Sequence, residues 1–417
     1  MECSLRFLGG CGEVGRSAVL IDDDILLDYG IKPGESSNHP AQYPLNGINP
    51  QTIIISHGHL DHCGLVPNIT DIRPDIYATP ITRHLTSFLA KDTLAIARRA
   101  GHVPPFYAQD INEFTRCARI TDYRDPFECS GYNAELYDAG HIPGSASVLL
   151  ESESGIRIFY TGDVNLADTR LLNGSEPQPK ADIMIVESTY YGTDHAPRKE
   201  MEQEFVDSIR ETIDRGGNAI IPCFAIGRTQ EILMILHKHG LHPYVDGMGV
   251  DVFKRFAQYP EYLRDSDALQ RAFDNATIVK PRARSRVLRN SIIVTTAGML
   301  NGGPALYYIN RAHDDRFSKI LLTGYQVEGT NGYHALNHRR MTVGKRVLHL
   351  RIAVEQYDFS AHSGDCELKK VVRRFCDLGG EIVFTMHGDR TEEFAAWARE
   401  HEVDATAPAN GERFMIE

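Results

Sequence analysis

Three histidines and one aspartate stand close together in the chain, at His57, His59, Asp61 and His62. They follow residues 52–55 (TIII), a β-branched run that is typical of a buried strand. His57 and His59 are two residues apart, so an extended chain points both side chains to the same side. Asp61 and His62 come after the turn and can face a second point in space. Because imidazole and carboxylate are ligands that zinc prefers, this segment predicts a site for two metals, with two ligands each.

Further titratable residues stand where other strand-like runs end, far away in the chain. They are His141, Asp163, Glu187, His362 and His387. The candidate ligands divide into three for one metal (His57, His59, His141), three for the other (Asp61, His62, His387), and Asp163 between them. Spacing alone does not show that these residues converge in space.

Such a ligand set indicates phosphoryl chemistry. Two adjacent cations make a shared water nucleophilic near neutral pH and stabilise the anionic transition state of an in-line displacement. The leaving oxygen then needs a proton, for which His362 is the candidate general acid, oriented and kept protonated by Glu187. We count Asp61 as a catalytic residue as well as a ligand. Asp28, at another strand end, either orients a metal-binding histidine or is a simple turn residue before Gly30.

Composition limits the class of protein. The 417 residues carry a net charge of −12, which argues against non-specific coating of nucleic acid but not against a nuclease with a local basic groove. No apolar run reaches membrane-spanning length, and the chain enters a strand-like pattern at once, so we expect no membrane contact and no signal peptide. Eight cysteines without a CxxC pair favour reduced thiols and a cytoplasmic location; Cys63 is expected to pack rather than bind metal.

Two sequence patterns need a structural interpretation. Gly10, Gly12 and Gly15 spell the dinucleotide motif GxGxxG, but strand-like residues 18–21 follow instead of a helix, so we predict a turn between strands. From residue 198 onward, helical and strand-like segments alternate, which indicates an α/β domain with a parallel sheet. Residues 280–289 hold five basic side chains, which fit either phosphate contact or a solvated surface.

The residues 57–62 (HGHLDH), together with Asp28, His141 and Asp163, resemble the HxHxDH signature and companion motifs of the metallo-β-lactamase superfamily. Stretches along the whole chain resemble the β-CASP nucleases more narrowly. They are 8–17, 187–190, 224–231, 246–248, 297–304, 324–330, 359–362 and His387. The resemblance implies an α/β fold: an αββα metallo-β-lactamase sandwich formed by residues 1–189 and 346–417, with an inserted β-CASP α/β domain at 190–345 and the active site in the cleft between them.

The resemblance also implies two zinc ions per subunit, with Glu187 and His362 as the proton-donor pair and His387 completing the second site. Within the family, a histidine at position 387 favours RNA over DNA as the substrate. The segments at residues 13–17 and 359–362 resemble those of the CPSF-like branch, which is found in archaea and eukaryotes. The chain resembles members without N-terminal KH domains, so its RNA contacts are expected in the cleft. Candidates are Ser360, Ala361, Ser363, Gly364, Arg228, Arg339, Arg340 and the basic run 280–289. Homodimers are common in the family. The sequence does not identify partners in RNA-processing complexes.

Several alternatives remain open at this point. Endonuclease and 5′→3′ exonuclease activity are not separable from the sequence, and Ser360 and Ser363 fit a 5′-phosphate pocket or scissile-phosphate contacts equally. A DNA nuclease of the same family is a second reading. A catalytically silent scaffold subunit would have lost metal ligands, whereas all seven positions are filled here. A small-molecule hydrolase of the superfamily would have no need of the inserted domain.

Overall fold

The computed structural model describes residues 3–34 and 40–416 and divides by compactness into two units. The first consists of Met1–Asp168, Gly174–Asp194 and Ala361–Glu417, and the second of Thr169–Asn173 and His195–Ser360. The strand β19 (Ala353–Gln356) pairs with β16 (Lys319–Leu322) in the sheet of the second unit. By compactness, residues 346–360 group with the second unit, and the domain boundary predicted at residue 345 stays a prediction.

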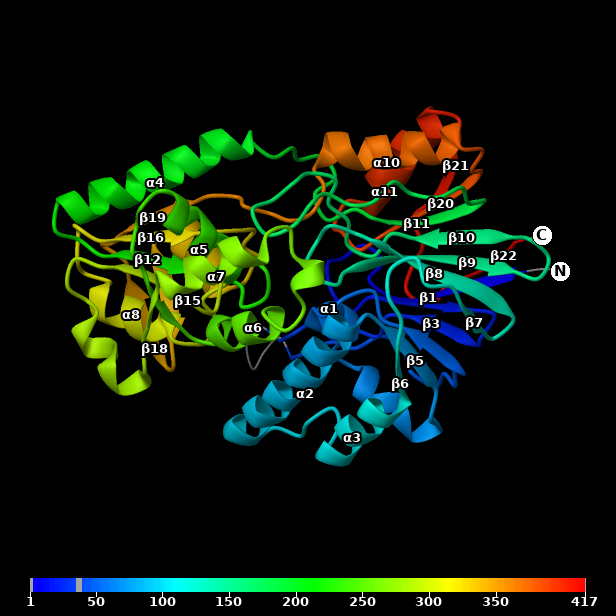
Figure 1. Ribbon diagram of the computed structural model, residues 1–417, viewed down its shortest axis with the longest axis horizontal. Helices are drawn as coiled ribbons and strands as arrows, with labels where there is room; N and C mark the ends of the chain where they lie inside the picture. Colours follow the sequence, from blue (N-terminus) through cyan, green and yellow to red (C-terminus); the bar gives the residue numbers. More distant parts are fainter. Residues whose placement is uncertain (1–2, 35–39, 417) are drawn as a thin grey trace. The chain divides into compact units, whose positions relative to one another are not determined.

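Two seven-stranded sheets form the centre of the first unit (Figure 1). One sheet has the order β22 (Arg413–Ile416), β1 (Cys3–Gly9), β2 (Ala18–Ile21), β3 (Ile25–Leu27), β4 (Thr52–Ile54), β5 (Asp75–Ala78) and β6 (Ala118–Ile120). The other has the order β21 (Asp404–Thr406), β20 (Ile382–Met386), β11 (Ile183–Glu187), β10 (Arg157–Tyr160), β9 (Ala146–Ser152), β8 (Tyr132–Asp138) and β7 (Phe127–Cys129). Both sheets combine strands that precede the inserted unit with strands that follow it, so the C-terminal return is part of the sandwich.

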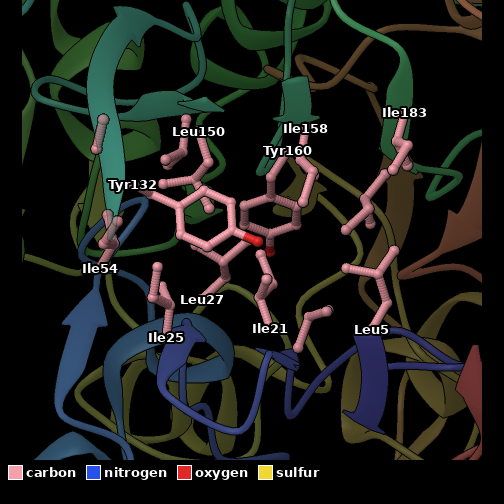
Figure 2. Close-up of a cluster of buried hydrophobic side chains, with 14 of the residues drawn as sticks. Leu5, Ile21, Ile25, Leu27, Ile54, Tyr132, Leu150, Ile158, Tyr160 and Ile183 are labelled. Atoms are coloured by element: carbon pink, nitrogen blue, oxygen red, sulfur yellow. The ribbon is translucent and has the colours of Figure 1, made fainter. Parts of the chain in front are cut away.

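The apolar core lies between these two sheets. Leu5, Ile21 and Leu27 from one sheet meet Leu150 and Ile158 from the other, and all five are fully buried (Figure 2). Alternate residues of each strand reach this layer because successive side chains of a strand point to opposite faces. Complete burial of an aliphatic side chain contributes roughly 1.5–3 kcal/mol, so this layer stabilises the unit substantially.

Helices cover the outer faces of the sandwich (Figure 1). The helices α10 (Asp365–Asp377) and α11 (Thr391–Glu400) pack on the second sheet through a cluster that includes Leu368, Phe375 and Phe394. On the other side lie α2 (Pro80–Ala100) and α3 (Ala108–Cys117), and the short α1 (Leu60–Cys63) follows β4. This is the predicted αββα arrangement, which is thereby confirmed. The glycine-rich segment between β1 and β2 is a turn, as predicted, because β2 pairs antiparallel with β1.

The second unit contains a sheet of parallel strands flanked by helices. Its order is β14 (Thr277–Ile278), β13 (Tyr244–Asp246), β15 (Ile292–Thr295), β12 (Ala219–Pro222), β16 and β19. The helices are α4 (Arg198–Asp214), α5 (Arg228–Lys238), α6 (Gly249–Phe256), α7 (Ser266–Asp274), α8 (Ala305–Ala312) and α9 (Asn331–His338). A separate hairpin joins β17 (Arg340–Val343) to β18 (Arg346–His349). The predicted parallel α/β domain is confirmed. Among the described residues, no helix combines the length and apolarity that a membrane crossing requires.

Candidate metal centre

The candidate residues come together because several parallel strands of the first unit end at the same edge. Parallel pairing joins β10 to β11 and β11 to β20, so Asp163, Glu187 and His387 lie at neighbouring carboxyl ends. On the other sheet β3 pairs parallel with β4, which places Asp28 beside the segment that begins at His57. The carboxyl ends of parallel strands are the usual location of binding sites in α/β proteins.

Three imidazoles and one carboxylate form the first group. Nδ1 of His59 lies 3.2 Å from Nε2 of His57 and 3.1 Å from Nε2 of His141. Oδ2 of Asp163 lies 3.5 Å from Nε2 of His57 and 3.6 Å from Nε2 of His141. Zinc–nitrogen bonds of 2.0–2.1 Å in tetrahedral geometry separate the ligand nitrogens by about 3.3 Å. These four residues therefore have the types and spacing of a zinc ligand set.

Asp61, His62 and His387 form the second group, and Asp163 connects it to the first. Oδ1 of Asp163 lies 3.3 Å from Nε2 of His62 and 3.2 Å from Nδ1 of His387, while Oδ2 faces the first group. Nε2 of His387 lies 3.5 Å from Oδ2 of Asp61. Nε2 of His62, Oδ1 of Asp163 and Nε2 of His387 are buried and have no hydrogen-bond partner among the described residues. Buried polar atoms without partners are costly, so these atoms fit a bound cation.

In the first group the electrostatics favour neutral imidazoles beside an ionised carboxylate, whereas at His62 burial is outweighed by Asp163 and Asp28, which raise the pKa well above its ordinary value. Burial lowers the pKa of His57 and of His141 well below the ordinary value, and it lowers the pKa of His59 to about 4. Although burial acts to raise the pKa of Asp163, His62 and His387 hold that pKa well below its usual range. Neutral imidazole and ionised carboxylate are the protonation states that bind metal. The same arrangement of charges attracts a divalent cation.

Asp28 orients His62 by binding the ring nitrogen that faces away from Asp163. Nδ1 of His62 donates to Oδ2 of Asp28 at 2.7 Å, which leaves Nε2 with a free lone pair on the side of Asp163. The backbone N–H and the hydroxyl of Ser56 and the hydroxyl of Tyr160 also donate to this carboxylate, at 2.7, 2.7 and 2.8 Å. Asp28 is fully buried and therefore cannot be a surface turn residue. A carboxylate bonded to the distal nitrogen of a ligand histidine fixes its tautomer and ring orientation.

Two features of the backbone, a carbonyl group at Ala361 and a glycine at position 30, help to position the ligands His141 and Asp61. The carbonyl oxygen of Ala361 accepts a hydrogen bond from Nδ1 of His141 at 2.8 Å, so Nε2 of His141 is the nitrogen available for metal. Gly30 lies against the carbonyl of Asp61, and a Cβ added there would come within 1.7 Å of that oxygen. The absence of a side chain at position 30 therefore allows the close approach that positions Asp61.

His362 and Glu187 form a pair beside the cluster. Nδ1 of His362 lies 3.0 Å from Oε1 of Glu187, and Nε2 lies 3.9 Å from Oδ2 of Asp163. Burial acts to lower the pKa of His362, but Glu187 and Asp163 outweigh it and raise the pKa to about 9. Glu187 is itself held in place, since the backbone N–H of Val164 donates to its Oε1 at 2.8 Å. The geometry suits a histidine that carries a proton at neutral pH.

The residues predicted to contact substrate differ in their burial, in their partners and in the unit to which they belong. Ser363 is fully buried, and its hydroxyl accepts from the backbone N–H of Leu166 at 3.2 Å. Gly364 precedes the first residue of α10. Ser360 and Arg228 belong to the second unit, where Nη1 of Arg228 lies 3.3 Å from Oε2 of Glu231. Their role as substrate contacts stays a prediction.

Sequence reasoning missed the residues that hold the ligands in position. Ser56 and Tyr160 bind the carboxylate of Asp28, and the hydroxyl of Thr189 lies 3.3 Å from Nδ1 of His387. Ser56 stands beside the histidine cluster in the sequence, which is a usable signal. Tyr160 and Thr189 carry no such signal, because their contacts depend on strands that meet only in the folded chain. The carbonyl of Ala361 orients His141, and the role of Ala361 in binding substrate stays a prediction.

The fold and the ligand set define a metallo-hydrolase of the β-lactamase superfamily. Residues 25–212 match the family model of the beta-lactamase superfamily domain, and residues 229–334 match the Beta-Casp domain. Residues 347–408 match the Zn-dependent metallo-hydrolase RNA specificity domain. A solved structure of a protein of unknown function from Enterococcus faecalis has a TM-score of 0.63 at 12% identity and covers 100% of both chains, which supports the fold alone.

Relatives that align with nearly the whole chain show to which family within this superfamily the chain belongs. Probable RNase MJ4 of Methanocaldococcus jannaschii is 37% identical, over 98% of this chain and 99% of its own length. RNase aCSPSF2 of Saccharolobus solfataricus is 32% identical over 100% of this chain and 86% of its own length. Transcription termination factor FttA of Pyrococcus horikoshii is 34% identical over 92% of this chain and 66% of its own length. The chain therefore belongs to the β-CASP family of metal-dependent ribonucleases built on the metallo-β-lactamase fold, in its archaeal CPSF-like branch. The resemblance drawn from the motifs is confirmed.

Proposed function

We propose that this chain hydrolyses phosphodiester bonds of RNA with two zinc ions held at the cluster. The observation that carries the proposal is the position of Asp163, whose two carboxylate oxygens face different histidine groups. His57, His59 and His141 would hold one ion, and Asp61, His62 and His387 the other. Two zinc ions at these groups would activate a water and neutralise charge on the scissile phosphate.

The chain's own residues then supply positioning and the proton. Asp28 holds the His62 ring, and the Ala361 carbonyl holds the His141 ring, so both present Nε2 inward. Glu187 keeps His362 protonated and turns its Nε2 toward Asp163, where a leaving oxygen can take the proton. Proton donation of this kind typically contributes about 10²–10⁴-fold to the rate.

RNA is the substrate class that the comparisons favour. One matched domain is described as an RNA specificity domain, and two of the relatives are named ribonucleases. All seven ligand positions are filled, which supports an active enzyme over a silent scaffold subunit. The following experiment decides whether the chain acts as a 5′→3′ exonuclease, as an endonuclease, or as both.

The test is a time course on one RNA that is labelled internally and carries a 5′ monophosphate, triphosphate or hydroxyl. Early mononucleotide release from the monophosphate form alone indicates a 5′→3′ exonuclease, whereas discrete internal fragments from all three forms indicate an endonuclease. A DNA strand of the same sequence is the matched substrate control, and His362→Ala is the matched protein control. Hydrolysis of the DNA with the RNA left intact would overturn the proposal.

A further inference from the structure

The second unit contains a stretch of chain from which acidic residues are missing. Between Glu328 and Glu355 there are five lysines and arginines and three histidines but no aspartate or glutamate, in a chain whose net charge is −12. The five cations are Arg339, Arg340, Lys345, Arg346 and Arg351. The stretch forms the helix α9 and the hairpin β17–β18 (labelled β18 in Figure 1).

The hairpin presents one apolar face to the core and one face to solvent. Met341 pairs with Leu348, and both are buried in the hydrophobic cluster of the second unit. Because side chains alternate along a strand, the neighbouring pairs point outward. These are Arg340 with His349 and Thr342 with Val347, and all four residues are exposed. Val347 is 59% exposed, which adds apolar area to the outer face.

Cations lie at both ends of the hairpin. Arg339 and Arg340 lie at its base and Lys345 and Arg346 at its tip, and all four are exposed. Arg340 belongs to the outer face, whereas Arg346 pairs with Val343 on the face of Met341 and Leu348 and is exposed there at the tip. Within residues 40–416 none of the four forms an ion pair, whereas Arg351 lies 3.7 Å from Asp314. Four strand residues separate base from tip by about 10 Å, which is the length of about three stacked nucleotides.

Aromatic rings adjoin the arginines at the base. The rings of Tyr333 and His334 on α9 lie 6.0 and 5.5 Å from the ring of His338, the last residue of that helix. His338 is exposed and directly precedes Arg339. Proteins bind single-stranded nucleic acid with cations next to aromatic rings, because the phosphates pair with the cations and the bases stack on the rings.

Hydrogen bonds fix the hairpin against the helix before any ligand binds. The side chain of Asn331, at the start of α9, donates to the carbonyl of Thr342 at 2.9 Å and accepts from its N–H at 2.8 Å. The N–H of Leu350 donates to the carbonyl of Arg339 at 2.8 Å and closes the base. A preformed surface loses little conformational entropy on binding.

The basic run 280–289 is a weaker candidate for the same role. Its central residue, Arg284, is bound to the buried carboxylate of Asp246 through Nε at 2.6 Å and Nη2 at 3.0 Å. The hydroxyl of Tyr308 donates to the same carboxylate at 2.8 Å. The carboxylate of Asp246 in β13 thus binds both Arg284 and Tyr308 of α8, and the charge of Arg284 is already paired with it rather than offered to a ligand.

We propose that the outer face of the β17–β18 hairpin, with the exposed cations at its base and tip and the end of α9, binds the phosphate backbone of single-stranded RNA. The inference rests on the proposed function, because it assigns a second contact for the same substrate, outside the residues that hold metal. Binding at this surface is independent of RNA sequence, since cations and stacking rings recognise features that all nucleotides share.

The test measures affinity for a labelled single-stranded RNA over a range of salt concentrations. It compares the chain carrying Arg340→Ala and Arg346→Ala with its parent, both in a His362→Ala background that prevents cleavage. Each lost contact with single-stranded RNA lowers the slope of log affinity against log salt by about 0.7, so we expect a decrease of about 1.4. At 100 mM salt the same slope corresponds to roughly 25-fold weaker binding.

Two control variants isolate the effect. Lys254→Ala with Arg271→Ala removes two exposed cations elsewhere in the second unit and should leave the salt slope unchanged. Arg340→Lys with Arg346→Lys keeps the charges and should retain most of the affinity. Met341 and Leu348 are untouched in both, so the melting temperature should stay within a few degrees of the parent. An unchanged slope in the alanine variant would overturn the inference and leave the surface to a partner such as an acidic protein.

A small substrate separates this inference from the proposed function. With active enzyme, the alanine variant should hydrolyse bis(p-nitrophenyl) phosphate at the parent rate, because one phosphate needs only the metal centre. Loss of RNA affinity with this rate retained supports the hairpin. If the parent binds RNA through Arg340 and Arg346 but cleaves none, the proposed function fails and the hairpin contact stands.

Discussion

His62 and Asp28 face each other with Nδ1 and Oδ2 2.7 Å apart, and both side chains are fully buried. The contact selects the tautomer in which Nδ1 carries the proton and Nε2 points toward Asp163. Asp28 is thus part of the metal centre without being a candidate ligand.

Asp28→Asn should weaken metal binding at the His62 group by about 10- to 100-fold. The amide keeps the shape and tolerates the left-handed backbone at this position, where φ is 58°. Its NH₂ group, turned to His62, would force the ring into the tautomer with hydrogen on Nε2. Zinc titration with a competing chelator measures the change. Asp22→Asn is the matched control, because Asp22 has a φ of 51° and its carboxylate accepts from Ser4 and Tyr132 in the same unit. Equal zinc affinity in the two variants would refute the orienting role.

His362→Ala should keep the metal content of the parent and lose about 10²–10⁴-fold in turnover. The reason is that His362 pairs with Glu187 and belongs to neither ligand group. Glu187→Gln should lower turnover in the same direction, because an amide no longer stabilises the protonated ring. Metal analysis beside single-turnover kinetics on RNA makes the distinction. Zinc lost from the His362→Ala protein would move that residue into the ligand set.

Asp138→Asn should stabilise the protein at pH 8 and have no such effect at pH 4. Burial raises the pKa of Asp138 from 3.8 to about 6, despite the hydrogen bond from the N–H of Gly140. The folded state therefore binds the proton more tightly than the unfolded state, so this group's contribution to stability falls as pH rises from about 4 to about 6. The gain at pH 8 is at most about 3 kcal/mol. Chemical denaturation at both pH values measures it, with the exposed Glu153→Gln as control. A gain of equal size at pH 4 would contradict the assignment.

The sequence predicted those parts of the molecule that depend on local pattern. The spacing of His57, His59, Asp61 and His62 indicated two ligand groups, and the structure separates the first two from the last two. The strand-like residues after Gly15 excluded a dinucleotide site, and β2 bears that out. The alternation after residue 198 predicted the parallel sheet.

Features that depend on tertiary contact could not be read in this way. Asp28 was equally well explained as a turn residue, and only the pairing of β3 with β4 brings it to His62. The basic run that contains Arg284 fitted either phosphate contact or a solvated surface, because the partner of Arg284, Asp246, is distant in the sequence. The predicted domain boundary at residue 345 rests on the resemblance alone, and nothing local in the sequence shows that β19 pairs with β16.

The number of zinc ions per chain, measured together with activity, tests the central claim most directly. Metal-free protein is titrated with zinc while bound metal and RNA cleavage are followed on the same samples. Asp163 between two ligand groups predicts two ions per chain, with cleavage appearing as the second ion binds. His59→Ala should lower the zinc content and abolish cleavage, since it removes a ligand of one group. Full cleavage with one zinc per chain, or with the His59→Ala protein, would contradict the account.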